Sequence, residues 1–200
     1  MDKTSAEQTL GQKSMDTRKM AIAYNIKRVF DRDVEIKPNS KWGIPFDPAA
    51  RGMLNVIPSE SDSDVTNGVL IEVSREDMAK VLLREEGYDL IPVIVQEWEN
   101  FIHNKPVYKI AYTFYAPQNS SYTSSSILPR PSYYELTRDA AYNFGPLFYL
   151  LWLKTTYMAD GITPIEDWEK EVKENSPATL KTASFINQES FLEAPKGVCR

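Results

Sequence analysis

GVLIEVSREDMAKVLLREEGYDLIPV, residues 68–93, contains the elements from which the fold can be predicted. The apolar, β-branched run Gly68–Val73 predicts a strand. Ser74, followed three residues later by Asp77, is a helix-capping pattern, so we expect a helix to begin here. That helix should end just before Gly87, a typical stop residue, and a second strand is expected at Tyr88–Trp98. The stretch therefore predicts a strand–helix–strand unit.

The rest of the chain adds strands before this unit and helices after it. Further strands are expected at Met20–Ile26, Met53–Ile57 and Val107–Tyr115, and helices from Tyr133 onward and at Leu147–Tyr157. This order favours an α+β fold with a small mixed β-barrel or sheet and flanking helices over a doubly wound parallel sheet. We expect residues 1–18 to be a flexible N-terminal segment, 19–160 to form the domain, and 161–200 to hold a short helix and a C-terminal tail.

Composition excludes several classes of function. A formal net charge of −5 disfavours nucleic acid as a partner. Cys199 and His103 are the only cysteine and histidine, so they can form neither an intrachain disulfide nor a Cys/His zinc site. There is no apolar signal-peptide core, and no apolar run approaches the roughly 20 residues of a membrane span. We therefore expect a soluble, cytoplasmic protein without a membrane partner.

One acidic residue is unusual at the end of the expected helix. With about 100° between successive residues, Glu85 falls inside the apolar stripe of Met78, Val81 and Leu82, whereas Glu86 falls at its border. A buried carboxylate is costly unless it has a partner or a task. Burial would raise the pKa of Glu85 toward the range useful for proton transfer near neutral pH. The alternative is a Glu85 that has left the helix and faces water.

Four stretches occur in an order found in one known family. MAIAYN (20–25) precedes RGMLNVIPSESDSDVTNGVLIEV (51–73), then comes Arg84-Glu85-x-x-Tyr88 with its Glu86-Gly87 pair, and then PSYYELTRDAAYNFGPLFYLLWL (131–153). Together they resemble the successive strands, Ser-capped helix and Pro-Ser-x-x-Tyr segment of the γ-glutamylcyclotransferase-like superfamily. The resemblance spans roughly residues 18–158, and it rests on the order and spacing of the motifs together.

The resemblance implies an activity and a set of site residues. In this family the substrate's own α-amino group attacks its γ-carbonyl, which releases 5-oxoproline and a free amine, with one glutamate as general acid/base. The spacing to Tyr88 places this glutamate at Glu85, whereas the Glu-Gly pair would place it at Glu86. Tyr88, Ser132 and Tyr134 are candidate substrate contacts; the alternatives are a strand residue, a helix cap and a packing aromatic. The implied partner is a small-molecule γ-glutamyl substrate, with no metal and no cofactor.

The sequence departs from the family at the N-terminal Tyr-Gly-Ser-Asn-type turn, which has no counterpart here. A first strand that lies upstream of this sequence, divergence, and a remnant turn at Tyr24-Asn25 are three explanations. A catalytically impaired member that binds a ligand or a protein, and a secondary-metabolism enzyme on the same fold, are therefore alternative functions. A missing strand would also leave a sheet edge open, which favours a homodimer.

Overall fold

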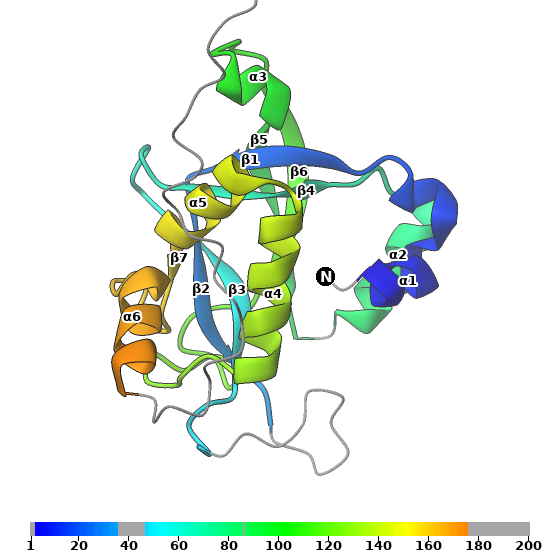
Figure 1. The fold of residues 1–200 in the computed structure, drawn as a ribbon. Helices are drawn as coiled ribbons and strands as arrows, with labels where there is room; N and C mark the ends of the chain where they lie inside the picture. The colour runs from blue at the N-terminus through cyan, green and yellow to red at the C-terminus, as the bar shows by residue number, and fades with distance from the viewer. Residues whose placement is uncertain (1–2, 36–46, 86, 176–200) are drawn as a thin grey trace, which may run out of the picture.

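The structure, a computed structural model, describes residues 3–35, 47–85 and 87–175, which form an α+β fold of two sheets with helices around them (Figure 1). In chain order the elements are α1 (Lys3–Met15), β1 (Lys19–Tyr24), β2 (Ile26–Asp33), β3 (Gly52–Pro58), β4 (Val65–Leu70), α2 (Arg75–Arg84), β5 (Asp89–Glu97), α3 (Trp98–Ile102), β6 (Lys109–Tyr115), α4 (Pro131–Asn143), α5 (Pro146–Lys154), β7 (Thr156–Tyr157) and α6 (Ile165–Asn175). The α+β class predicted from the sequence is confirmed.

The larger sheet contains the predicted strand–helix–strand unit. Its strand order is β4-β1-β5-β6, and every neighbouring pair is antiparallel. Because β4 and β5 both run antiparallel to β1, they run parallel to each other, and α2 connects them across the strand between. The smaller sheet has the order β3-β2-β7 and is mixed, since β2 and β7 are parallel.

The expectation of a barrel is wrong for the described strands, which form two separate sheets. The strands separate at Asn25, whose φ of 58° bends the chain between β1 and β2. Residues 26–33, for which the sequence predicted no long strand, then form β2 and pair with β3 and β7 instead of joining the larger sheet. The sheets still touch, since the Thr66 hydroxyl donates a hydrogen bond to the Ile26 carbonyl at 3.2 Å.

Helix α2 begins where the sequence predicts and ends two residues before the expected last residue, Glu86. The Ser74 hydroxyl oxygen accepts a hydrogen bond from the Asp77 backbone N–H at 3.1 Å, so the predicted cap is confirmed. The last helical residue is Arg84, and Glu85 is the C-cap. Gly87 follows with a φ of 82°, a left-handed conformation that glycine adopts without strain.

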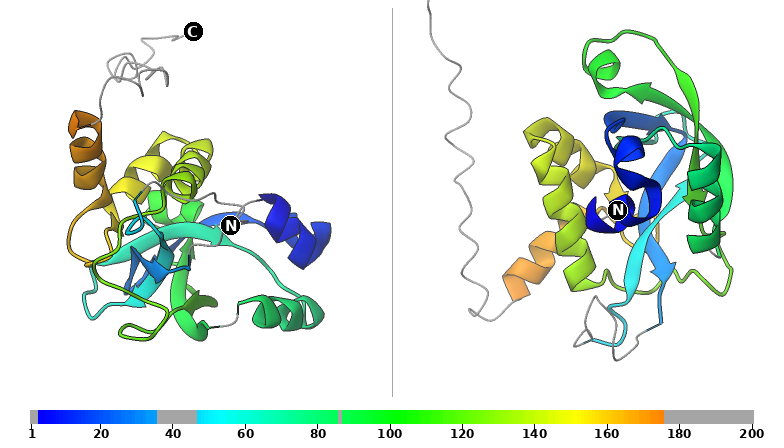
Figure 2. Two further views of the ribbon diagram at one scale, coloured as in Figure 1. Left: turned by 90° about the horizontal axis from the view of Figure 1, so that it is seen from below. Right: turned by 90° about the vertical axis from the view of Figure 1, so that its right-hand side faces the viewer.

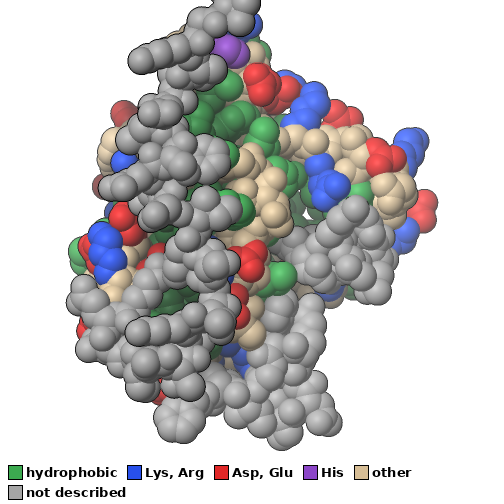
Figure 3. Space-filling view, viewed as in Figure 1, with side chains coloured by type: hydrophobic (Ala, Val, Ile, Leu, Met, Phe, Trp, Pro, Cys, Tyr) green, Lys and Arg blue, Asp and Glu red, His purple; other side chains and the backbone are tan. Residues whose placement is uncertain are grey.

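The main core lies between the sheets and the helices α4, α5 and α6 (Figures 1 and 2). Its most buried members are aromatic and branched side chains from several elements, namely Ile22, Phe30, Tyr134, Phe148, Trp152 and Ile165. Burial of such side chains is the dominant favourable contribution to folding. Figure 3 shows further hydrophobic side chains over the upper part of one face, with a hollow between them and charged side chains beside it.

The structure contains a helix near each end of its described ranges. Where the sequence predicted a flexible segment, residues 3–15 form α1, interrupted at Gly11, which has non-helical dihedral angles. Leu10 and Met15 of this helix are buried against Val81 of α2, and this contact gives α1 a reason to be ordered. The short helix expected after residue 161 is α6, and the expected tail at 176–200 lies outside the described residues.

No helix in the described ranges is both long enough and apolar enough to cross a membrane. The same ranges contain no group of three His, Cys, Asp or Glu side chains placed to hold a metal ion.

Candidate functional site

Glu85 lies at the end of α2, on the side of the helix that faces the protein. Its backbone N–H donates to the Val81 carbonyl at 2.9 Å, and Val81 is the buried residue of α2. The Glu85 side chain is 22% exposed. The apolar stripe predicted from the helical wheel is only partly buried, because Leu82 is 49% exposed. Glu85 therefore sits at the border between the protein interior and solvent, with one side open to water.

One oxygen of the Glu85 carboxylate is held by its neighbour. Arg84 donates from Nε to Oε1 at 2.8 Å, and its Nη2 donates to the same oxygen. The other oxygen, Oε2, accepts no hydrogen bond from any side chain in the described ranges. Half of the carboxylate is therefore available to a further group. Glu86, the alternative position for the family glutamate, lies outside the described residues.

Two tyrosines lie within the electrostatic reach of Glu85. Burial raises the pKa of Tyr88, the nearby Arg32 guanidinium opposes this, and the charges of Glu85 and Asp31 raise it further. Burial also raises the pKa of Tyr133, with further contributions from Tyr88 and Glu85. Both phenols therefore stay protonated at neutral pH, the state in which a phenol can donate a hydrogen bond.

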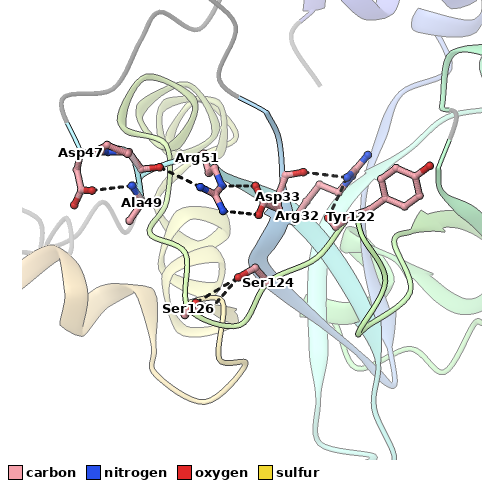
Figure 4. Close-up of polar contacts among 9 residues, drawn as sticks. Arg32, Asp33, Asp47, Ala49, Arg51, Tyr122, Ser124 and Ser126 are labelled. Atoms are coloured by element: carbon pink, nitrogen blue, oxygen red, sulfur yellow. Dashed lines mark hydrogen bonds and ion pairs between the residues drawn. The ribbon is translucent and has the colours of Figure 1, made fainter.

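The loop that follows Glu85 is clamped by a cation between two aromatic rings. The Arg32 guanidinium carbon lies 4.8 Å from the ring centroid of Tyr88 and 4.7 Å from that of Tyr122. Figure 4 shows that Arg32 also donates to the Tyr122 carbonyl, at 3.0 Å. Gly87 approaches the same ring so closely that an added Cβ would lie 3.1 Å from Tyr122 Cζ. These contacts fix Tyr88 next to Glu85.

Asp33 supports this clamp from the neighbouring position. Its carboxylate accepts two hydrogen bonds from Arg51, from Nε at 2.5 Å and from Nη2 at 2.9 Å, and its backbone carbonyl accepts one from Arg32 at 3.2 Å (Figure 4). The paired hydrogen bonds tie β2 to the start of β3, where Arg51 lies. The end of β2 is therefore held on both sides of Arg32.

Asp31 is a buried acid behind this clamp. Asp31 is 4% exposed, and its carboxylate oxygen Oδ1 has no hydrogen-bond partner among the described residues. Burial raises the pKa of its carboxyl, and a hydrogen bond from Asn55 and the charge of Arg32 oppose the shift only in part. Nothing in the sequence indicated that Asp31 would be buried, because β2 was not predicted as a strand.

Arg28 is a buried cation on the opposite face of β2. It donates to Thr156 Oγ1 at 3.0 Å and to Asn67 Oδ1 at 3.1 Å, and none of the ion pairs within the described ranges involves it. Burial lowers the pKa of Arg28 to about 9, and the nearby Tyr133 opposes this shift.

The two other predicted contacts, Ser132 and Tyr134, lie in the first turn of α4, and Ser132 is exposed. Tyr134 is 4% exposed. Its ring centroid lies 5.1 Å from that of Trp168, 5.9 Å from that of Phe30 and 6.0 Å from that of Trp152. Its environment is that of a packing aromatic.

Tyr133, which sequence reasoning missed, is the α4 tyrosine whose pKa is raised by the charge of Glu85. Adjacent helical residues point about 100° apart, so only one of the two neighbouring tyrosines can face the end of α2. The signal that could have found it was the direction of the helix, which the sequence does not contain.

The suggested remnant turn is at a different place from Glu85. Asn25 N–H donates to the Asp64 carbonyl at 2.9 Å, Ser59 N–H donates to the Asn25 carbonyl at 2.8 Å, and Asn25 Nδ2 donates to Asp62 at 3.0 Å. These contacts bind the turn between β1 and β2 to the loop between β3 and β4, on the other side of the sheets from α2 (Figure 1). In this structure the turn at Tyr24-Asn25 supports the sheets.

A pocket of about 300 Å³ lies elsewhere on the molecule. It is formed by residues 125–128, by residues of the connection between β7 and α6, and by Trp168, Asp167 and Glu171 of α6. None of the four site residues predicted from the sequence lines it. The predicted site and this pocket are therefore separate features.

Comparisons with known proteins assign no family. No protein-family description matches the chain. No curated protein matches it either. Among solved structures, one Arabidopsis thaliana protein in solution is similar at 13% identity over 88% of this chain and 87% of that one, with a TM-score of 0.41. A second Arabidopsis thaliana protein is similar at 15% identity over 92% and 90%, also with a TM-score of 0.41. What this chain does must be inferred from its own residues.

Proposed function

We propose that the protein is a γ-glutamylcyclotransferase-like enzyme that releases 5-oxoproline and a free amine from a γ-glutamyl peptide or amine, with Glu85 as general acid/base. The observation that carries this proposal is a partly exposed carboxylate beside two protonated phenols. Glu85 leaves Oε2 without a partner in the described ranges, and its charge raises the pKa of both Tyr88 and Tyr133. The end of α2 thereby supplies a proton acceptor, and the connection to β5 and helix α4 each supply a hydrogen-bond donor.

This set of groups suits an intramolecular acyl transfer. Glu85 removes a proton from the α-ammonium group, and the resulting amine attacks the γ-carbonyl to form the ring C–N bond. The γ-amide C–N bond then breaks, and Glu85 returns its proton to the leaving amine. The ring nitrogen loses its second proton, and the released amine takes up one proton from water to become an ammonium ion. The nucleophile and the electrophile belong to one molecule, so the enzyme needs to supply little of the proximity. Tyr88 and Tyr133 would donate hydrogen bonds to the oxyanion that develops on the γ-carbonyl.

Release of 5-oxoproline from a panel of γ-glutamyl peptides and amines tests the reaction. We expect Glu85→Gln to abolish turnover. Glu76→Gln is the matched control, because Glu76 lies on the same helix and its side chain is 84% exposed in an ion pair with Lys80. Full activity in Glu85→Gln together with loss in Glu86→Gln would move the catalytic role to Glu86. Activity in both variants would exclude this mechanism.

A second candidate is a binding protein without turnover. The observation that favours it is the double contact from Arg84 to Oε1 of Glu85, which holds the carboxylate at the helix end. The family's glycine turn, whose amides hold the substrate, also has no counterpart in the sequence. Calorimetric binding of a γ-glutamyl amine with no release of 5-oxoproline would support this second function over the first.

A further inference from the structure

Strand β6 is an open edge of the larger sheet. The strand order β4-β1-β5-β6 gives it β5 as its hydrogen-bonded neighbour, and no other described strand pairs with it. The opposite edge strand, β4, contacts β2, whose Arg28 donates to the carbonyl of Asn67. The far end of β6 contacts β3, where Asn55 exchanges two hydrogen bonds with Ala116, the residue after the strand. Figure 2 shows the hairpin of β5 and β6 at the margin of the molecule. The outer N–H and C=O groups of β6 are thus available to another strand.

This edge also carries exposed hydrophobic side chains. Ile110 is 74% exposed and Tyr112 is 63% exposed, and they point to the same face because they are two residues apart in a strand. Across the ladder, Ile94 pairs with Ile110 and Pro92 pairs with Tyr112. Ile94 is 52% exposed. The open edge therefore continues into an apolar patch formed by Pro92, Ile94, Ile110 and Tyr112.

Edge strands in monomeric proteins are usually protected by charges, prolines or bulges. In β6 the one charged residue is Lys109, at the beginning of the strand, and its ammonium group already pairs with Glu97. The six residues after it, IAYTFY, carry no charge and no proline, and their ladder to β5 has no bulge. A long, uncharged and regular edge of this kind requires a partner strand to be safe from aggregation.

The residues of β6 are complementary to a second copy of the same strand. In an antiparallel pair related by a two-fold axis at Ala111, Ile110 lies opposite Tyr112 of the second copy, and this contact occurs twice. Lys109 lies opposite Thr113 of the second copy, so no like charges meet. The isoleucine–tyrosine pairs, aromatic against β-branched, are of the kind that stabilises neighbouring strands.

We propose that β6 pairs with β6 of a second copy of this chain, which joins two four-stranded sheets into one antiparallel sheet across a homodimer. The backbone groups of the two edges supply the hydrogen bonds, and the apolar patches become contiguous on one face. This inference is independent of the proposed catalytic function.

Molar mass from light scattering during size-exclusion chromatography tests the proposal on the full chain. We expect the mass of a dimer, and the mass of a monomer for Ile110→Lys. The control is Ile162→Lys, which puts the same charge at an isoleucine that is 79% exposed between β7 and α6, and it should remain a dimer. Circular dichroism shows whether each variant is folded. A monomer at every concentration, or a dimer that survives both Ile110→Lys and Tyr112→Lys, overturns the proposal.

Disulfide formation tests the register. Residues directly opposite each other in antiparallel strands have Cα atoms about 4.5–5.5 Å apart, which is within the range for a disulfide. In a background of Cys199→Ser, we expect Ala111→Cys to form a cross-linked dimer under mild oxidation. Thr113→Cys should not, because the two-fold axis moves its two copies apart. Cross-linking of Thr113→Cys alone would contradict an axis at Ala111.

Discussion

The guanidinium of Arg32 stacks on the ring of Tyr88, with 4.8 Å between the guanidinium carbon and the ring centroid. This contact joins the end of β2 to the residue that leads from α2 into β5. Because Tyr122 stacks on the other face of Arg32 at 4.7 Å, the guanidinium is enclosed between two rings. The position of the proposed site therefore depends on an arginine that is remote in sequence from Glu85.

Replacing Arg32 should destabilise the protein. Arg32→Met removes two cation–π contacts and one of the two hydrogen bonds that the Tyr122 carbonyl accepts, so we expect the free energy of unfolding to fall by about 2 kcal/mol. Urea unfolding measures this difference. Arg75→Met, at an exposed arginine on α2, is the control and should change stability by less than about 0.5 kcal/mol. Equal effects for the two variants would show that the stacking contributes little.

Two glycines should respond to alanine in opposite directions. Gly87 has a φ of 82°, and a Cβ added there would lie 3.1 Å from the ring of Tyr122. Gly87→Ala should therefore lower the free energy of unfolding by at least about 1 kcal/mol. Gly68 lies within β4, and an added Cβ there meets nothing within 4 Å. Gly68→Ala should therefore leave stability unchanged or raise it by up to about 1 kcal/mol. Thermal unfolding of both variants checks the prediction, and the same sign for both would contradict it.

Asp31 should make stability fall as pH rises. Burial raises the pKa of its carboxyl in the folded protein, so the folded state binds this proton more tightly than the unfolded chain. Ionising the buried carboxyl costs free energy in the folded state. This cost is absent below the pKa of Asp31 in the unfolded chain, about 3.9, and stability is lost as pH rises through the higher pKa of the folded state. Asp31→Asn removes this titration.

We expect Asp31→Asn to be more stable than the parent at neutral pH by about 1 kcal/mol, with the difference disappearing in acid. Urea unfolding at a series of pH values measures the difference. Asp33→Asn is the comparison, because Asp33 is paired with Arg51 at 2.9 Å and its replacement should destabilise at neutral pH. A destabilised Asp31→Asn at neutral pH would mean that the ionised carboxylate is satisfied in the fold.

Neighbouring tyrosines on α4 should differ in their effect on turnover. If the proposed reaction is correct, Tyr133→Phe removes a donor to the developing oxyanion and should lower kcat by about 10²-fold. Tyr134→Phe should leave kcat nearly unchanged, because the ring of Tyr134 packs in the core against Trp168 and Phe30. Steady-state release of 5-oxoproline separates the two. The reverse order of effects would favour Tyr134 as the substrate contact.

The elements near α2 could be predicted because their signals are local. Ser74 caps a helix that begins one residue later, and Gly87 lies just beyond its end. Strand β2 could not be predicted in the same way. Its residues IKRVFDRD mix charges with apolar residues, and Arg28 and Asp31 are both buried, so the usual alternation of polar and apolar residues is absent. The two separate sheets follow from this strand.

The sequence alone was sufficient for the α+β class, for the start of α2 and for its end to within two residues. These depend on interactions between residues a few positions apart, such as the bond from the Glu85 N–H to the Val81 carbonyl. The tertiary structure decided that Tyr134 packs in the core against Trp168 and Phe30, and that Arg32 stacks between Tyr88 and Tyr122. Such contacts join distant segments, and they form only because burial of the common core brings those segments together.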